Sequence, residues 1–212
     1  MSSSPLTRLI VVRHGETEWN AEGRLMNQLD SPLTPAGLAG AEALALRLRS
    51  VPAAALYTSD LGRALRTAQC IAACNGLDPI HHPGLRERHL GTFAGHLRDE
   101  LETVFPEEYA RYRSDPDYVV PEGESFRQFF NRTVAAFQEI AAAHWGETVI
   151  VVTHGGCLDC LFRHVSHMPL DVPRAVRLPN TGVNVFEVQR DRWFLLTWGD
   201  TSHGIESSDD VF

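Results

Sequence analysis

The stretch "RLIVVRHGETEWN", residues 8–20, joins a short apolar run directly to a group of charged side chains. The run from Leu9 to Val12 has the length and composition of a strand that is buried on both faces of a parallel sheet. It ends without a spacer in Arg13 and His14, and a glycine and two acids around a threonine follow. Because charged side chains are rarely buried without partners, the end of this strand needs a reason to carry two basic groups.

A second apolar run ends in the same way. In "ETVIVVTHGG", residues 147–156, the run leads into His154 and two glycines. Ligands of open parallel α/β sheets bind outside the carboxyl ends of the strands. We therefore expect His14 and His154 to lie at one edge of a sheet, beside backbone N–H groups that can meet an anion. One histidine at a strand end is more often structural, but two in matching surroundings favour a functional site.

Strands and helices alternate along the chain. Thr34 is a predicted N-cap with Pro35 in the first turn of its helix, and Gly76 is the predicted end of the next helix. The most amphipathic predicted helix, residues 124–144, has five apolar residues on one stripe: Phe126, Phe130, Val134, Phe137 and Ala141. The other predicted helices cover residues 33–50, 60–76, 98–112 and 156–167, and the other predicted strands lie within residues 53–59, 79–82 and 182–200. This order predicts a mostly parallel sheet covered by helices on both faces.

Composition limits the class of protein. With 212 residues, 43% of them hydrophobic, the chain can build one large core, and we expect residues 1–212 to form a single domain. A net charge of −8 argues against a nucleic-acid partner, because such binding needs an excess of Lys and Arg. No stretch approaches the roughly 18 apolar residues of a membrane span, and no secretory signal is recognisable. We expect a cytoplasmic protein without a membrane partner, and a homodimer is compatible with the sequence.

The four cysteines fit a reducing compartment better than a disulfide framework. The motif "CLDC", Cys157 to Cys160, has the spacing of a redox pair or of half a zinc site, but no second cysteine pair completes it. Buried structural thiols are the favoured interpretation. The remaining histidines lack the carboxylate or thiolate neighbours of a metal site, so no metal ligand is predicted.

The sequence resembles the histidine phosphatase superfamily, the phosphoglycerate-mutase-like phosphatases, from about Arg8 to His203. Four separated signatures carry the resemblance: "VRHGETEWN", "SDLGRALRTA", "LRERHLGTFAG" and "VVTHGG". The resemblance implies a three-layer α/β/α sandwich with a mostly parallel central sheet and a pocket at the carboxyl ends of the strands. That fold agrees with the alternation of strands and helices.

The resemblance also implies roles for individual residues. It makes His14 the nucleophile that receives the phosphoryl group, and Glu87 the acid that gives a proton to the leaving oxygen. Three residues form the implied clamp around the phosphoryl oxygens: Arg13, Arg63 and His154, the last also counted as catalytic. The implied secondary phosphate contacts are Asn20, Thr17 and Gly155.

These residue types suit phosphoryl transfer on physical grounds. The reaction needs an attacking atom in line with the leaving group and positive groups around the oxygens that carry charge in the transition state. Neighbouring Arg13 and Arg63 disfavour a protonated imidazole, so His14 is expected to be neutral and nucleophilic. Since two guanidinium groups and a second imidazole supply the charge, no metal or other cofactor is expected. Taken alone, Arg63 would be interpreted as an exposed helix residue paired with Asp60, because surface ion pairs are common; the other signatures favour the clamp.

Residues 93–130 are predicted to cover the pocket as a helical lid. Six residues in or near this segment are candidates for contacts with the rest of the substrate: Arg86, Arg88, His89, Arg98, Tyr109 and Arg113. The tail, residues 201–212, is polar and acidic enough to be flexible, or it folds over the pocket; the sequence leaves both open.

The favoured function is a metal-independent phosphomonoester hydrolase, a histidine acid-type phosphatase, acting on a small phosphorylated metabolite. A cofactor-dependent phosphoglycerate mutase is the alternative, disfavoured because the chain lacks the longer basic, proline-rich insert and extended tail of those enzymes. A phosphoprotein phosphatase and an inactive phosphate-binding protein are further alternatives. The inactive protein is the least favoured, because nucleophile, clamp and acid are all present.

Overall fold

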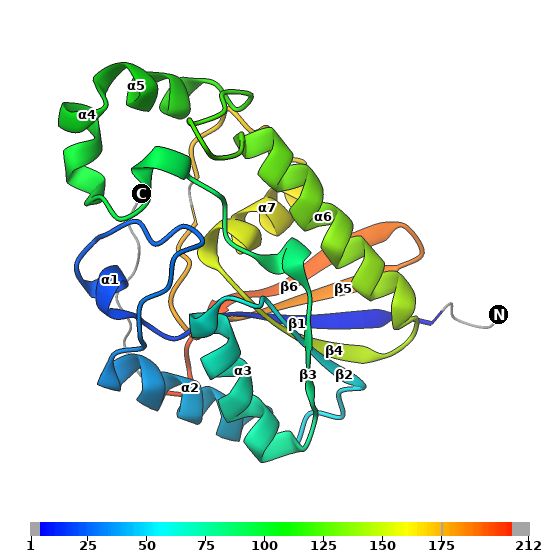
Figure 1. Cartoon of the computed structure of the whole chain (residues 1–212). Helices are drawn as coiled ribbons and strands as arrows, with labels where there is room; N and C mark the ends of the chain where they lie inside the picture. Colours follow the sequence, from blue (N-terminus) through cyan, green and yellow to red (C-terminus); the bar gives the residue numbers. More distant parts are fainter. Residues whose placement is uncertain (1–4, 175, 205–212) are drawn as a thin grey trace.

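The computed structural model describes residues 5–174 and 176–204. Within this part of the chain, six strands form one sheet in the order β3-β2-β4-β1-β5-β6 (Figure 1). The strands are β1 (Thr7–Arg13), β2 (Ala55–Thr58), β3 (Pro79–His81), β4 (Thr148–Thr153), β5 (Val183–Gln189) and β6 (Arg192–Asp200). The first four run parallel, whereas β5 and β6 form an antiparallel hairpin whose β5 pairs with β1. The prediction of a mostly parallel sheet is confirmed.

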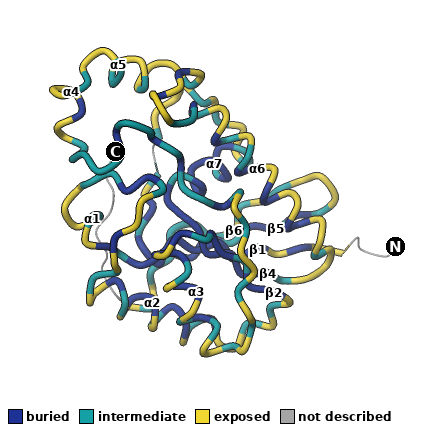
Figure 2. Tube along the Cα trace, in the orientation of Figure 1, coloured by how far each residue is buried: buried dark blue, intermediate teal, exposed yellow. Residues whose placement is uncertain are grey.

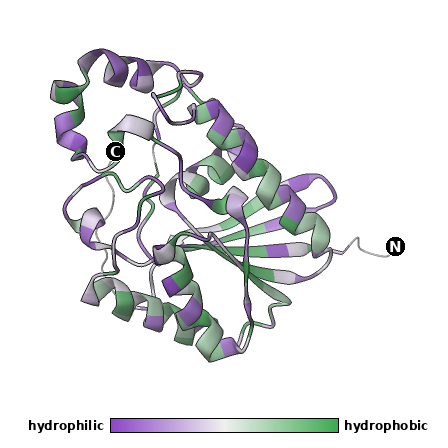
Figure 3. Ribbon diagram, viewed as in Figure 1, coloured by the Kyte–Doolittle hydropathy of each residue, from purple (hydrophilic) through white to green (hydrophobic). Residues whose placement is uncertain are grey.

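Helices cover both faces of this sheet (Figure 1). Alternate residues of β1 enter different cores: Leu9 and Val11 pack with α6 (Phe126–Ala143) and α7 (Gly155–Ser166), and the residues between them pack with α2 (Pro35–Leu48) and α3 (Gly62–Asn75). This follows from the two-residue period of a strand. Figures 2 and 3 show the result for the central strands β1 and β4, which are mostly buried and apolar. The fold is therefore the expected three-layer α/β/α sandwich.

The predicted helix ends are largely confirmed. Thr34 accepts a hydrogen bond from the N–H of Gly37 at 2.9 Å, and Gly76 ends α3 in the left-handed conformation with φ of 74°. The stripe predicted on α6 is only partly right, because Phe126 and Phe130 are half-buried while Phe129 is buried. The first turn of α6 lies beside the pocket described below, so the buried stripe there is shifted.

A separate segment, residues 90–123, lies beside the carboxyl ends of the strands (Figure 1). We call it the cap segment; it contains η2 (Gly91–Phe93), η3 (Arg98–Glu100), α4 (Leu101–Val104) and α5 (Pro106–Ser114). Its own small core consists of Leu90, Phe93, Leu101, Tyr118 and Val120. The ends of the segment meet, since the N–H of Thr92 donates to the carbonyl of Pro121 at 3.0 Å. The helix predicted over residues 98–112 is divided before Pro106, and residues 126–130 of the predicted lid belong to α6.

Three further expectations concern other parts of the chain. Among the described residues, no helix is long and apolar enough to cross a membrane, and no group of three His, Cys, Asp or Glu side chains could hold a metal ion. Cys157 and Cys160 are buried free thiols, and burial raises the pKa of Cys157 to about 12. From residue 205 onward, the tail lies outside the described residues.

Candidate active site

The topology brings the two predicted histidines together. β1 and β4 are parallel neighbours, and the N–H of His14 donates to the carbonyl of Thr153 at 3.0 Å, immediately before His154. The ring centroids of His14 and His154 lie 5.2 Å apart, and both side chains are buried. Two strands that run side by side in the same direction therefore end in a pair of imidazoles at one edge of the sheet.

The His14 ring is oriented by its neighbours. Its Nδ1 lies 2.8 Å from the carbonyl oxygen of Gly15. Because a carbonyl oxygen can only accept a hydrogen bond, the proton of the neutral ring is on Nδ1. The other nitrogen, Nε2, then carries a lone pair and accepts from Nε of Arg63 at 3.3 Å. Burial, followed by the charges of Arg63 and Arg13, holds the pKa of His14 well below its ordinary value. The imidazole is thus neutral at physiological pH.

Arg63 is fixed in the first turn of α3. Its guanidinium donates to the carbonyls of Asn27 and Leu29, both at 2.8 Å, and to Oδ1 of Asp30 at 3.1 Å. Asp30 also accepts from the N–H of Gly62 at 2.6 Å, so one carboxylate positions both the side chain and the start of its helix. The alternative prediction, that Arg63 is an exposed residue paired with Asp60, is wrong, because Arg63 is buried and pairs with Asp30.

The guanidinium that does pair with Asp60 is that of Arg86, which lowers the pKa of this carboxyl. Arg13, the other clamp arginine, is almost fully buried and donates to the carbonyl of Leu178. Both predicted clamp arginines are therefore buried side chains, and the charge of each acts on His14.

His154 is held by a residue that the sequence did not indicate. Its Nε2 lies 2.8 Å from Oγ of Ser59, the residue directly after β2. Burial, then the charge of Arg63, lowers the pKa of His154 well below its ordinary value. Nδ1 of His154 is buried and makes no hydrogen bond with the described residues. Ser59 could have been found by the rule that located the histidines, because it too follows a parallel strand.

Glu87 is bound to the start of α7. Its Oε2 accepts from the N–H of Gly156 at 2.9 Å, and its Oε1 from the N–H of Arg88 at 2.7 Å. A Cβ atom at position 156 would lie 2.1 Å from Oε1 of Glu87 and 2.9 Å from the ring of Phe129. Only glycine at 156 lets the carboxylate approach the helix terminus, where free N–H groups favour an anion.

The loop that carries Glu87 is held from below by Arg132 of α6. This guanidinium donates to the carbonyls of Gly84, Arg86 and Glu87 at 3.1, 2.8 and 2.9 Å. It also forms an ion pair with Glu124 at 2.6 Å. Three carbonyls that converge on one charged donor fix the path of the loop, so Arg132 is a positioning residue for Glu87.

The three predicted secondary contacts differ in position. Asn20 lines the pocket, and its Oδ1 accepts from the N–H of Thr17 at 3.2 Å, which leaves its NH₂ group as the donor that can serve a ligand. Thr17 is fully buried as the N-cap of α1 (Glu18–Ala21) and does not line the pocket. In the structure Thr17 holds Asn20, and its direct contact with phosphate stays a prediction. Gly155 begins α7, where a Cβ would lie 3.4 Å from Nε of Arg13.

Comparison with known proteins agrees with this geometry. The model of the histidine phosphatase superfamily (branch 1) matches residues 9–201. The chain belongs to this superfamily. A metal-independent phosphoserine phosphatase of Arabidopsis thaliana is 41% identical over 204 residues, which cover 94% of this chain and 84% of the relative. The relationship makes this histidine phosphatase an enzyme of the phosphatase type.

Two further similarities widen the range of relatives. The probable phosphoglycerate mutase GpmB of Serratia proteamaculans is 36% identical over 205 residues, which cover 93% of this chain and 95% of the relative. The solved structure of Bacillus stearothermophilus YhfR superimposes with a TM-score of 0.85 at 38% identity, covering 94% of this chain and 100% of that one. The likeness therefore extends over nearly the whole histidine phosphatase.

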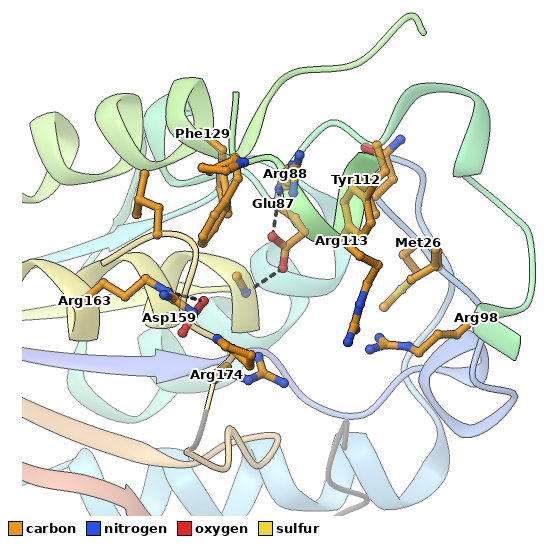
Figure 4. Close-up of a pocket in the computed structure, with 18 of the residues that line it drawn as sticks. Met26, Glu87, Arg88, Arg98, Tyr112, Arg113, Phe129, Asp159, Arg163 and Arg174 are labelled. Carbon is orange, nitrogen blue, oxygen red and sulfur yellow. Dashed lines mark hydrogen bonds and ion pairs between the residues drawn. The ribbon is translucent and has the colours of Figure 1, made fainter. Parts of the chain in front are cut away.

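The pocket of this histidine phosphatase extends from His14 to the cap segment. Figure 4 shows Glu87 at this pocket together with Arg98, Tyr112 and Arg113 of the cap segment. Of the six predicted substrate contacts, Arg88, Arg98 and Arg113 line it. Arg86 is instead paired with Asp60, and Tyr109 stacks on Tyr112 within the cap segment. His89 does not line the pocket either.

Other lining residues were not predicted: Arg24, Met26, Asn27, Tyr112, Asp159, Arg163 and Arg174. Most come from loops or from the far end of α7. Their side chains meet only after folding, so no local pattern in the sequence indicates them.

Proposed function

We propose that this histidine phosphatase hydrolyses the phosphomonoester of a small metabolite without a metal ion, through a phosphohistidine at His14. The observation that carries the proposal is the neutral, buried His14 ring, whose Nε2 accepts from Nε of Arg63 while its Nδ1 is bound to the carbonyl of Gly15. A neutral imidazole with a directed lone pair is a competent nucleophile.

In the proposed first step, Nε2 of His14 attacks phosphorus and the bond from phosphorus to the leaving oxygen breaks. The clamp of Arg13, Arg63 and His154 stabilises the charge on the phosphoryl oxygens, and the amide of Asn20 and the N–H of Gly155 add donors. Glu87 supplies the proton that the leaving alkoxide needs. Thr17 contributes by holding Asn20.

In the second step, water attacks the phosphohistidine and the bond from nitrogen to phosphorus breaks. Glu87, now a carboxylate, accepts the proton of the attacking water, and inorganic phosphate leaves. This exchange of roles returns His14 and Glu87 to their starting states. The guanidinium groups of Arg13 and Arg63 supply the positive charge for both steps, and His154 adds a hydrogen-bonding group beside them.

The relatives support two candidate outcomes, hydrolysis and phosphoglycerate isomerisation. We favour hydrolysis, because the chain lacks the longer basic insert expected of the cofactor-dependent mutases. A phosphoprotein phosphatase is a third, less favoured possibility. The expected cytoplasmic location and the homodimer stay predictions.

The test is a panel of phosphorylated metabolites assayed for phosphate release, with and without bisphosphoglycerate, together with labelling by a ³²P substrate. We expect phosphate release, an acid-labile and alkali-stable label on the wild type, and no label on His14→Ala. EDTA should leave the rate unchanged. Isomerisation that depends on bisphosphoglycerate would support the mutase, and equal labelling of both proteins would overturn the role of His14.

A further inference from the structure

The turn that precedes β5, residues 178–182, contacts the end of β1 at several points. The carbonyl of Leu178 accepts from the guanidinium of Arg13. The N–H of Thr181 donates to the carbonyls of Arg13 and His14 at 3.1 and 3.4 Å. The proposed mechanism gives this turn no role, although it holds both residues on which β1 ends at the site.

Thr181 has an unfavourable backbone conformation within the turn. Its φ of 58° lies in the left-handed region, which β-branched residues rarely adopt because their Cβ atom is crowded by the backbone. A glycine stands at the next position, 182, and does not occupy the strained one. Such conformations persist only where the surrounding structure imposes them, and they cluster at functional sites. The shape of this turn therefore needs a functional reason.

The residue before Thr181 supplies one. Asn180 is buried, and its Nδ2 donates to the carbonyl of His14 at 2.9 Å and, more weakly, to Oδ1 of Asn20 at 3.5 Å. Its own Oδ1 is buried and makes no hydrogen bond with the described residues. Turning the amide over would bring this oxygen against a carbonyl, which can only accept. The orientation is thus kept even though a buried oxygen without a donor costs free energy.

The Asn20 amide is oriented from two sides. Its Oδ1 accepts from the N–H and the hydroxyl of Thr17 at 3.2 and 3.1 Å, in addition to Nδ2 of Asn180. Because the oxygen is occupied by these donors, the NH₂ group of Asn20 is left for a ligand in the pocket that Asn20 lines. One buried amide, that of Asn180, therefore joins the backbone of the proposed nucleophile to a proposed phosphate donor.

We propose that Asn180 is a positioning residue for phosphoryl transfer, which fixes the backbone of His14 relative to the Asn20 amide and is itself presented by the strained turn at Thr181. The inference rests on the proposed function of His14 and Asn20. Asn180 is only 1% exposed and does not line the pocket, so it acts through these two residues. Attack on phosphorus needs an aligned nucleophile, and a misplacement of about 1 Å costs about 10²-fold in rate.

A neighbouring asparagine offers a matched control. Asn184 of β5 is 2% exposed, and its Nδ2 donates to the carbonyls of Val11 and Gly182 at 3.0 and 3.2 Å. Its Oδ1 has a donor as well. Asn180 and Asn184 are thus equally buried and both bond backbone carbonyls, but only Asn180 bonds residues of the proposed site. A loss that comes from packing alone should appear in both variants.

The test compares Asn180→Ala with Asn184→Ala in the single-turnover release of p-nitrophenolate from p-nitrophenyl phosphate, with enzyme in excess. This rate measures phosphorylation of His14, and the phenolate hardly needs the proton of Glu87. Urea unfolding gives the folded fraction, to which each rate is referred. We expect Asn180→Ala to be slower by about tenfold or more, and Asn184→Ala to lose stability with its rate nearly unchanged. Equal slowing of the two variants would overturn the proposal.

A double-mutant cycle with Asn20→Ala tests the link between the two amides. The loss caused by Asn180→Ala should be severalfold smaller when residue 20 is already alanine, because part of the loss comes from a misoriented Asn20 amide. Losses that multiply independently would contradict this link, since a purely structural effect of Asn180 does not depend on residue 20.

Thr181→Gly decides the question if Asn180→Ala does not fold. Glycine adopts a φ of 58° without strain, so the fold should be retained, but the turn gains freedom and the rate should fall severalfold. An unchanged rate in this variant would refute the role of the turn. A wild type that releases no p-nitrophenolate would instead contradict the hydrolase proposal itself.

Discussion

Gly156→Ala tests whether the approach of Glu87 to α7 controls catalysis. The new Cβ would lie 2.1 Å from Oε1 of Glu87, whereas such contacts are not found below 3.0 Å, so the carboxylate has to retreat by about 1 Å. The same Cβ would also lie 2.9 Å from the ring of Phe129, so the new methyl group has no free space on this side of α7. The hydrogen bond from the N–H of residue 156 to Oε2 is lost or lengthened.

The expected loss follows from this displacement. A misplacement of 1 Å costs about 10²-fold in rate, and complete loss of a general acid costs about 10²- to 10⁴-fold. We therefore expect kcat for an alkyl phosphate to fall about 10²-fold in Gly156→Ala, close to the effect of Glu87→Gln. The loss with p-nitrophenyl phosphate should be about tenfold or less, since its phenolate hardly needs a proton.

The assay compares kcat for the two esters at saturating substrate, under conditions where phosphorylation of His14 limits the rate. Gly155→Ala is the neighbouring comparison: its Cβ makes an ordinary contact of 3.4 Å with Arg13, so its loss should be smaller and should not depend on the leaving group. Equal losses on the two esters in Gly156→Ala would refute the reasoning. So would a crystal structure of this variant in which Glu87 has not moved.

Three other outcomes are expected. Arg132→Gln should lower kcat for alkyl phosphates about tenfold but hardly change inhibition by inorganic phosphate, because Arg132 holds the Glu87 loop and does not line the pocket; weaker phosphate inhibition would contradict a purely positioning role. Arg63→Ala should lower kcat about 10²- to 10³-fold, measured by steady-state kinetics; a loss confined to KM would refute transition-state stabilisation. Burial lowers the pKa of His14 and of His154, so below about pH 6.5 the unfolded chain binds more protons than the folded chain. The stability that the two neutral histidines contribute is therefore complete above that pH. On acidification the free energy of unfolding falls by up to about 1.4 kcal/mol per pH unit for each histidine. Urea unfolding from pH 8 to pH 5 measures this slope, which should be shallower in His14→Gln.

Much of the fold could be predicted because its signals are local. The apolar runs before His14 and His154 define two strands, and the rule that ligands bind at strand ends places both histidines at one edge. The N-cap at Thr34 and the helix end at Gly76 are likewise decided by residues within one turn. Where the packing of neighbouring elements enters, as on the stripe of α6, the prediction is only partly right.

The site shows the same division. The sequence by itself predicted the candidate reacting groups: His14 and His154 stand at strand ends, and the resemblance to the family assigned roles to both histidines, to Arg63 and to Glu87. Only the tertiary structure decided what holds them. Glu87 accepts from the N–H of Gly156, 69 residues later in the chain, and Ser59 lies within hydrogen-bond distance of His154, 95 residues later. Both contacts depend on the distances between strands, loops and helices in the folded protein.

Asp159 is the clearest case of what only the tertiary structure decided. In the sequence it is one residue between two cysteines, and in the fold it is a carboxylate on the pocket wall, one helical turn from Gly156. The period of a helix fixes which residues share a face, and this much could be predicted for α7. Which face meets the pocket depends on the packing of α7 against the sheet and α6, and that packing is set by contacts between segments far apart in the chain.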